Sequence, residues 1–311
     1  MENTPDIAVV IPVFNEAGNI LPLVSQLHHH LEPTGNSFYL LFVNDGSTDN
    51  TLENLKEISA EDHQVKYISF SRNFGHQAAL RAGLESARAR AVIIMDGDLQ
   101  HPPQLVTEML KLWKDGYLVV NTMRLSAEGE NFFKKTTSLL FYKIFSFLSS
   151  SEMKAGSADF RLIDIRVVHA IRSLHEYHFF FRGLIPWLGF RQTTISYIPN
   201  KRNQGMPSYT LIKMVKLAAT GITSFSNKPL HIATIIGIVF SLISFFYGVY
   251  AVSIRLLMGK ELSGWTSIIM SVLFIGGIQL LILGIFGEYL GKIYDEVKMR
   301  PRYIIEDKNI T

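Results

Sequence analysis

Two long stretches without a charged residue set the strongest limit on how this chain folds. They run from Ile232 to Ile254 and from Leu262 to Gly287, and each exceeds the ~20 residues that a helix needs to cross a bilayer. A buried core helix rarely runs so far without a charge, so we predict two membrane-spanning helices. The connecting "RLLMGKE" is too short to form a domain. The two spans therefore form a hairpin with both ends on one side.

The charges that flank the hairpin predict its orientation. Basic residues are more numerous outside the hairpin than in its loop, where only Arg255 and Lys260 occur. By the positive-inside bias, the large N-terminal region is then cytosolic. The start, "MENTPDIAVV", also lacks the basic flank and apolar run of a signal peptide. The flanking basic residues are Lys201, Arg202, Lys213, Lys216 and Lys228 before the hairpin and Lys292, Lys298, Arg300 and Arg302 after it.

The region before the hairpin alternates apolar runs with helical patterns. Continuous apolar strands separated by helices are typical of an α/β fold with a mostly parallel sheet covered on both faces. Such sheets bind ligands at the carboxyl ends of their strands, and polar groups follow several of the runs here. The predicted strands are Ile7–Phe14, Phe38–Val43, Val65–Phe70, Ala91–Met95 and Tyr117–Thr122.

The stretch "IIMDGDLQHPP" ends one of these strands with two carboxylates, Asp96 and Asp98. Side chains two residues apart on an extended segment point the same way, so repulsion would disfavour ionisation of both. No Lys or Arg stands beside them. A divalent cation is the expected partner, with Gln100 as a third oxygen donor, and hard oxygen ligands favour Mg²⁺ or Mn²⁺. A solvated surface pair is the alternative, which the end of a buried strand disfavours.

Composition excludes several other classes. The chain has no cysteine, so disulfides, thiolate metal sites and cysteine nucleophiles are excluded. Its net charge of +3 gives no sign of nucleic-acid binding. The 48% hydrophobic content and mean hydropathy of +0.18 are high for a soluble protein. Much of that apolar character lies between Leu230 and Gly287. No P-loop motif is present, which disfavours a nucleotide-dependent kinase.

Two further segments have the pattern of helices at a membrane surface. "FFKKTTSLLFYKIFSFLS" and "GMPSYTLIKMVKLAATGITSFSNKPL" both combine apolar and aromatic residues with lysines. Such helices suit the boundary between headgroups and acyl chains. For each helix, packing against a protein core remains an equal alternative.

Several motifs in order resemble family 2 glycosyltransferases with a GT-A (Rossmann-like) fold. The resemblance is to the polyprenyl-phosphate subgroup, such as bactoprenol glucosyltransferases and dolichyl-phosphate mannose synthases, and it covers nearly the whole chain. The motifs are "VVIPVFNE", "VNDGSTDNT", "SRNFGHQAALRAGL", "MDGDLQHPP", "GSADFRLID" and "GEYLGKIYDEVKMRPRY". The implied division is a cytosolic GT-A catalytic domain (1–203), interfacial amphipathic helices (204–230), a transmembrane hairpin (231–288) and a cytosolic tail (289–311).

The resemblance implies a metal-dependent, inverting transfer of one sugar to undecaprenyl phosphate at the cytosolic face of the inner (plasma) membrane. UDP-glucose is the expected donor, and the product would serve modification of lipopolysaccharide, O-antigen or another envelope glycan. A modified arabinose, galactose or an N-acetylhexosamine remains an alternative sugar. A membrane-tethered sugar-binding or scaffold protein is the non-enzymatic alternative. Homo-oligomers are compatible with the small residues of the second span, namely Gly276, Gly277, Gly284, Gly287 and Gly291.

The resemblance also implies residue roles. The cation would be held by Asp96, Asp98 and Gln100. The nucleotide sugar would contact Asp96 and also Pro12, Asn15, Glu16, Asp45, Arg72 and Asn73. Catalytic roles fall on Asp98, Asp159 and Arg161, and the acceptor phosphate would meet Arg202 and Arg161.

Each of the weaker assignments has a structural alternative. Asp45 would otherwise sit in a capping turn, Arg72 and Asn73 would pack a loop, and Asp159 and Arg161 would form a structural ion pair.

Two positions depart from the subgroup pattern. Pro207 and Ser208 stand where a Ser-Lys pair is usual, so the expected lysine is missing, and Lys201 or Lys213 would have to compensate. His101 replaces an aspartate after the Asp-x-Asp-Leu-Gln motif. We expect His101 to be a loop residue rather than a metal ligand.

Overall fold

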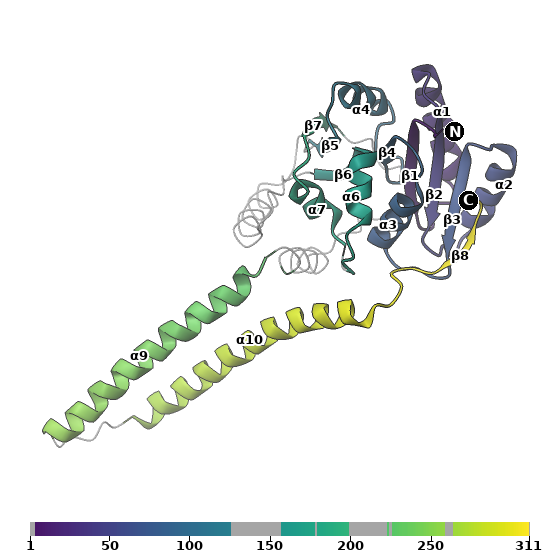
Figure 1. Ribbon diagram of the computed structural model, residues 1–311. Coiled ribbons are helices and arrows are strands. Elements are labelled where there is room, and N and C mark those ends of the chain that lie inside the picture. The colour runs from purple at the N-terminus through teal and green to yellow at the C-terminus, as the bar shows by residue number, and fades with distance from the viewer. Residues whose placement is uncertain are drawn as a thin grey trace. The chain divides into compact units, whose positions relative to one another are not determined.

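The computed structural model describes residues 4–125, 157–177, 179–198, 223, 226–258 and 264–310. The chain divides into two compact units. The first holds a β-sheet with its helices and the last residues of the chain, and the second holds two long helices (Figure 1). Arg202 and most of the two amphipathic segments, including Lys134 and Lys213, lie outside the described residues.

The first unit is built on an eight-stranded sheet in the order β7-β5-β6-β4-β1-β2-β3-β8. All neighbours from β4 to β3 are parallel, as are β5 and β7. Strand β6 is antiparallel to β4 and β5, and β8 is antiparallel to β3. The strands are β1 (Ile7–Val13), β2 (Phe38–Asn44), β3 (Val65–Phe70), β4 (Ala91–Ile94), β5 (Val119–Arg124), β6 (Ser157–Asp164), β7 (Gln192–Tyr197) and β8 (Ile305–Lys308).

The predicted α/β fold with a mostly parallel sheet is confirmed, and all five predicted strands are present. Every residue of β1 and β2 is buried, which is the reason these strands read as unbroken apolar runs rather than alternating ones. Strands β6, β7 and β8 were not predicted.

Helices cover both faces of the sheet. The core on one face joins alternate residues of β1, such as Val9 and Ile11, to apolar side chains of α1, α2 and α4. On the other face, α3 packs against β1, β2 and α6 (Figure 1). The helices of this unit are α1 (Ile20–Leu31), α2 (Thr51–Glu61), α3 (His76–Ser86), α4 (Leu105–Lys114), α6 (Ile165–Arg172) and α7 (Phe181–Trp187), with a short 3₁₀ turn at Glu32–Thr34.

The end of the chain returns to the sheet. Strand β8 pairs with the free edge of β3, and Asn309 Oδ1 accepts a hydrogen bond from Tyr67 N. Tyr303 stacks on Phe70 with ring centroids 4.9 Å apart. Lys56 Nζ lies 2.7 Å from Asp307 Oδ2. These contacts tie the tail to the same unit that begins the chain.

The second unit contains α9 (Lys228–Met258) and α10 (Trp265–Lys298). By length and composition, each is apolar enough to cross a membrane, over Lys228–Tyr250 and Ser271–Lys298. Only 6% and 0% of the most apolar windows are buried, whereas the core helix of a soluble protein would be mostly buried. Both predicted spans overlap these helices, and α10 continues beyond Gly287 to Lys298.

Candidate functional site

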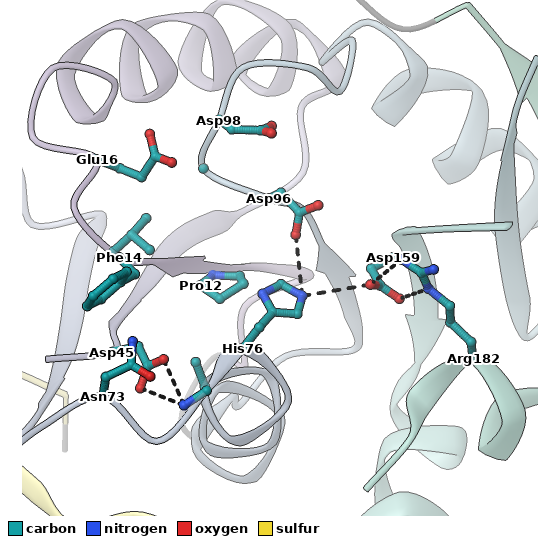
Figure 2. Close-up of a pocket in the computed structure, with 14 residues that line it drawn as sticks. Pro12, Phe14, Glu16, Asp45, Asn73, His76, Asp96, Asp98, Asp159 and Arg182 are labelled. Carbon is teal, nitrogen blue, oxygen red and sulfur yellow. Dashed lines mark hydrogen bonds and ion pairs between the residues drawn. The ribbon is translucent and has the colours of Figure 1, made fainter. Parts of the chain in front are cut away.

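A pocket of about 400 Å³ opens at the carboxyl ends of β1, β2 and β4 (Figure 2). This is the edge of the sheet at which a ligand site was expected. Its lining comes from six separate segments of the chain and includes Pro12, Val13, Phe14, Glu16, Asp45, Asn73, Gly75, His76, Ala79, Asp96, Gly97, Asp98, Asp159 and Arg182.

The lining is rich in carboxylates. It contains Glu16, Asp45, Asp96, Asp98 and Asp159, whereas its basic members among the described residues are His76 and Arg182. Like charges gathered in one partly buried volume repel each other unless cations are present. The pocket is therefore suited to a bound cation together with the anionic ligands that such a cation attracts.

The loop after β4 places the two aspartates of the Asp-Gly-Asp sequence at the pocket. A Cβ on Gly97 would lie 2.6 Å from Val13 Cγ1, so only glycine lets this loop approach the end of β1 so closely. Leu99 adopts a left-handed backbone with φ of 61°, a conformation that non-glycine residues rarely hold outside functional sites. Asp98 Oδ1 accepts a hydrogen bond from Gln100 N at 3.1 Å.

Asp96 is supported by two histidines. His101, whose side chain is 2% exposed, places Nε2 3.0 Å from Asp96 Oδ2, and its Nδ1 lies 2.9 Å from the Tyr197 hydroxyl. His76 Nε2 lies 3.6 Å from Asp96 Oδ1. Burial alone would raise the pKa of Asp96, but the hydrogen bond from His101 and the charge of His76 hold it below its usual range. Asp96 is thus ionised at neutral pH.

The aspartates fit one side of a divalent cation. Asp96 Oδ1 is buried without a hydrogen-bond partner among the described residues, and Asp98 lies beside it on the pocket wall. In the part of the chain that is described, no group of three or more His, Cys, Asp or Glu side chains is arranged to hold a metal. The two carboxylates suit Mg²⁺ or Mn²⁺, ions that usually keep several waters and bind substrate phosphates. Gln100 does not line the pocket, and its Oε1 accepts a hydrogen bond from Arg124.

Asp45 holds the loop that precedes α3. Its carboxylate accepts hydrogen bonds from Phe74 N at 2.7 Å and Gly75 N at 2.9 Å. Burial raises the pKa of Asp45, although these backbone bonds and nearby basic groups oppose that rise. Asn73 lines the pocket. Arg72 does not, since its guanidinium lies 4.1 Å from the centre of the Phe74 ring.

Asn15 joins the loops after β1 and β2. Its backbone is left-handed, with φ of 56°. Asn15 N donates to Ser47 Oγ at 2.9 Å, and Asn15 Oδ1 accepts from Thr48 N at 2.8 Å. Asn15 is not part of the pocket lining, whereas Pro12 and Glu16 are. Asn15 thus supports the wall that these two residues form.

Asp159 lines the pocket, whereas Arg161 lies behind it in the protein interior. Arg182 Nε and Nη2 donate to the two oxygens of Asp159 at 3.0 and 2.9 Å. Arg161 is 1% exposed, donates to Ala158 O and lies 3.5 Å from Asp159 Oδ1. Arg161 therefore supports Asp159 from within the protein and does not line the pocket.

Asp159 is an ion held by cations on several sides. Burial alone would raise its pKa, but contact with His76 and the charges of Arg182 and Arg161 hold that pKa far below its usual range. A carboxylate with such a low pKa is a weak base. Its geometry instead suits the orientation of Arg182.

Sequence reasoning missed the two basic residues of the lining, His76 and Arg182. His76 lies between the carboxylates, 3.6 Å from Asp96 Oδ1 and 3.7 Å from Asp159 Oδ2 (Figure 2). Its side chain is recessed in the pocket yet remains 42% exposed. Burial lowers its pKa, but the two carboxylates outweigh that effect and raise it. His76 stands within "SRNFGHQAALRAGL", a motif that signals its importance but not its partners.

The comparison with known proteins gives the family of the chain. Residues 8–172 match the family described as Glycosyl transferase family 2. The chain belongs to this family, and its sheet with two C-terminal apolar helices is a GT-A domain followed by a helical hairpin.

Relatives match the chain over nearly its whole length. The uncharacterized glycosyltransferase YkcC of Bacillus subtilis is 44% identical over 96% of this chain and 93% of its own. The SfII prophage-derived bactoprenol glucosyl transferase of Shigella flexneri is 36% identical over 96% of this chain and 97% of its own. The prophage bactoprenol glucosyl transferase homolog of Escherichia coli K12 is 35% identical over 96% and 98%.

Proposed function

We propose that this glycosyltransferase transfers one sugar from a nucleotide sugar to undecaprenyl phosphate at the cytosolic face of the inner membrane. Glucose from UDP-glucose is the proposed donor sugar. Relatives named as bactoprenol glucosyl transferases support this proposal, because their match over 96% of the chain takes in both apolar helices as well as the sheet.

The observation that carries the proposal is the division of the pocket into two halves around Asp96 (Figure 2). On one side lie Asp45 and Asn73, and on the other lie Asp159 and Arg182. A nucleotide on the first side and an acceptor on the second would meet at the two aspartates of the β4 loop. This is the arrangement that a two-substrate transfer requires.

The chain's residues can perform this transfer without a general base. A hydroxyl nucleophile must lose a proton, whereas a phosphate monoester is already an anion and can attack the sugar carbon directly. Asp159 is too weak a base to take a proton, so its proposed role is electrostatic. Asp96 and Asp98 would hold Mg²⁺ or Mn²⁺, which when bound stabilises the negative charge of the departing diphosphate.

Orientation then sets the stereochemical outcome. Because the two substrates would occupy opposite halves of the pocket, the acceptor oxygen would approach the sugar from the face away from the diphosphate. The bond from the sugar carbon to the acceptor phosphate oxygen forms as the bond to the diphosphate oxygen breaks, and the anomeric configuration inverts. Holding both reactants in this geometry supplies much of the rate enhancement.

Two rival functions have different signatures. A processive polysaccharide synthase would carry a "QxxRW" sequence and more spans, and neither is visible in the sequence. A tethered scaffold that only binds sugar would have no need for the paired aspartates. In a third alternative, the protein carries out the same transfer with a sugar other than glucose.

The test is a screen of radiolabelled nucleotide sugars with the purified full-length protein in lipid and undecaprenyl phosphate. Label should enter the organic phase as a polyprenyl-phosphate sugar with UDP-glucose, and Asp98→Asn should abolish it. If only another nucleotide sugar gives label, its sugar, and not glucose, is the one transferred. No label from any donor, with the nucleotide still bound, would favour the scaffold.

A further inference from the structure

The structure assigns a specific partner to Arg182: we propose that it binds the phosphate of the acceptor, and that Asp159 orients it for this purpose. The inference rests on the proposed function and adds to it a residue that contacts the acceptor. The resemblance placed this role on Arg202 and Arg161. Arg202 lies outside the described residues, and Arg161 is buried away from the pocket.

Arg182 is the only Arg or Lys that lines the pocket among the described residues. Its side chain is 29% exposed, whereas the side chain of Asp159 is 7% exposed. The cation thus lies on the accessible side of the pair and the carboxylate behind it. An anion that enters the pocket would meet the guanidinium before the carboxylate.

Asp159 fixes the plane of this guanidinium. The two parallel hydrogen bonds from Nε and Nη2 form a bidentate pair, and such pairs add geometric specificity to their strength. Asp159 is itself held by Arg161 from within the protein and by His76 across the pocket. The side chain of Arg182 is therefore preorganised, which lowers the entropic cost of binding an anion.

The position of Arg182 favours the acceptor over the donor phosphates. The paired aspartates, where the donor diphosphate would sit with its cation, lie between the Asp45 side and the Asp159–Arg182 side (Figure 2). An acceptor that attacks from the face opposite the diphosphate would enter on the Arg182 side. Both candidate ligands are phosphates, so the experiment must separate them.

The charge of the pocket makes a fixed cation necessary. A phosphate monoester dianion would otherwise approach a wall of five carboxylates, which only His76 and the cation on the paired aspartates would offset among the described residues. Arginine suits this task because its planar fork matches phosphate oxygens and its charge is permanent. Lysine would preserve the charge but lose the paired donors.

The test uses the purified full-length protein in lipid and compares Arg182→Lys and Arg182→Gln with Arg191→Gln, a control outside the pocket. We expect the KM for undecaprenyl phosphate to rise at least about tenfold in both Arg182 variants, the scale of a lost charge-assisted hydrogen bond. The affinity for UDP with Mn²⁺, measured by calorimetry, should stay within about threefold of wild type, because the proposal gives Arg182 no hydrogen bond to UDP. A loss of UDP binding with an unchanged acceptor KM would overturn the proposal and place Arg182 on the donor.

A double variant separates phosphate binding from simple neutralisation of Asp159. If Arg182 serves only as the counterion of Asp159, its removal should do no further harm once Asp159 is neutral. The proposal instead expects Asp159→Asn/Arg182→Gln to have a higher acceptor KM than Asp159→Asn alone. Equal acceptor KM values in these two variants would overturn it.

A binding measurement keeps the inference independent of turnover. Farnesyl phosphate, titrated against the full-length protein and followed by phosphorus NMR, should bind wild type and the Arg191 control but bind Arg182→Gln at least about tenfold more weakly. If wild type binds farnesyl phosphate through Arg182 yet transfers no sugar to undecaprenyl phosphate, the proposed function fails while the phosphate site stands. Equal binding by wild type and Arg182→Gln would sink the site itself.

Discussion

His101 Nε2 lies 3.0 Å from Asp96 Oδ2, which joins a fully enclosed ring to the carboxylate at the centre of the pocket. Because Asp96 is ionised and can only accept, Nε2 must carry a proton. Nδ1 of the same ring lies 2.9 Å from the Tyr197 hydroxyl. A line of hydrogen bonds thus runs from the edge strand β7 to the candidate metal ligand.

Removing His101 should impair turnover and stability together. In His101→Ala, Asp96 loses its hydrogen bond and a cavity opens beside Phe160. We therefore expect the free energy of unfolding to fall by at least about 1–3 kcal/mol. We expect kcat to fall as well. Tyr197→Phe removes only the contact between the Tyr197 hydroxyl and His101, and it should lower the free energy of unfolding by about 1 kcal/mol. Thermal unfolding and transfer assays on both variants check this. Wild-type kcat in His101→Ala would show that Asp96 needs no such support.

The strands that sequence reasoning found and missed differ in a physical way. Strands β1, β2 and β4 are buried on both faces and β3 is nearly so, which makes their apolar runs stand out. Strand β6 carries Asp159, Arg161 and Asp164. Burial of the two aspartates depends on partners from other elements, namely Arg182 of α7 for Asp159 and Trp113 of α4 and Arg166 of α6 for Asp164. Strand β8, "IEDK", is largely exposed. Its position depends on pairing with β3 more than two hundred residues earlier, which no local pattern reveals.

Loss of the second aspartate of the β4 loop should abolish metal-supported transfer. Asp98→Asn should lower kcat by at least about a hundredfold, the scale of removing a leading electrostatic contact to the transition state. Wild type should lose activity in EDTA and regain it with Mn²⁺ or Mg²⁺. Asp115→Asn, an exposed position after α4, is the matched control and should stay active. Full activity in chelator would exclude the metal role.

Gly46 should be indispensable to the nucleotide side of the pocket. It has a φ of 64°, and a Cβ there would lie 2.3 Å from the carbonyl carbon of Arg72. Gly46→Ala must push away the loop that Asp45 holds, so UDP binding should be lost. Gly35 has a similar φ of 68° but nothing within 4 Å of its Cβ position. Gly35→Ala should cost only the left-handed penalty of about 1 kcal/mol and leave UDP affinity unchanged, as calorimetry can test.

The candidate site shows the same division between local and distant information. The Asp96–Asp98 pair was predictable because both follow one apolar strand. His76 and Arg182 reach the pocket from α3 and α7, and nothing in their local sequence indicates that they meet at Asp159. Gln100 and Arg72 stand within the motifs from which their roles were predicted. The Gln100 side chain instead accepts a hydrogen bond from Arg124, and the Arg72 guanidinium lies over the Phe74 ring.

The pairing of His76 should make stability depend on pH above about 6.5, the unfolded pKa of histidine. Its pKa is raised in the folded protein. The stabilisation by its protonated form is therefore complete at pH values below the unfolded pKa of about 6.5. That contribution is lost as pH rises through the folded pKa. Because the side chain is 42% exposed, the effect should be at most about 1 kcal/mol, or about 2–4 °C in Tm.

The measurement compares wild type with His76→Asn in EDTA without nucleotide. The Tm difference should be largest near pH 6 and shrink toward pH 9. A difference that stays constant over this range would show that His76 does not gain stability from its protonated form.

The return of the chain to the sheet predicts the topology of the hairpin. Residues before α9 and residues after α10 belong to one folded unit, because β8 pairs with β3. If both helices cross the membrane, their outer ends must therefore lie on the same side as the sheet. The basic flanks predict that this side is the cytosol, and only the loop that contains Lys260 should face outward.

Single cysteines in this cysteine-free chain provide a clean test with a membrane-impermeant thiol reagent on intact cells. Lys260→Cys should be labelled, whereas Asn50→Cys and Glu306→Cys, both exposed on the sheet unit, should react only after lysis. Labelling of Asn50→Cys and Glu306→Cys in intact cells would reverse the orientation. Labelling of only one of these two would show that a helix does not span the membrane, and it would break the link between the tail and the sheet.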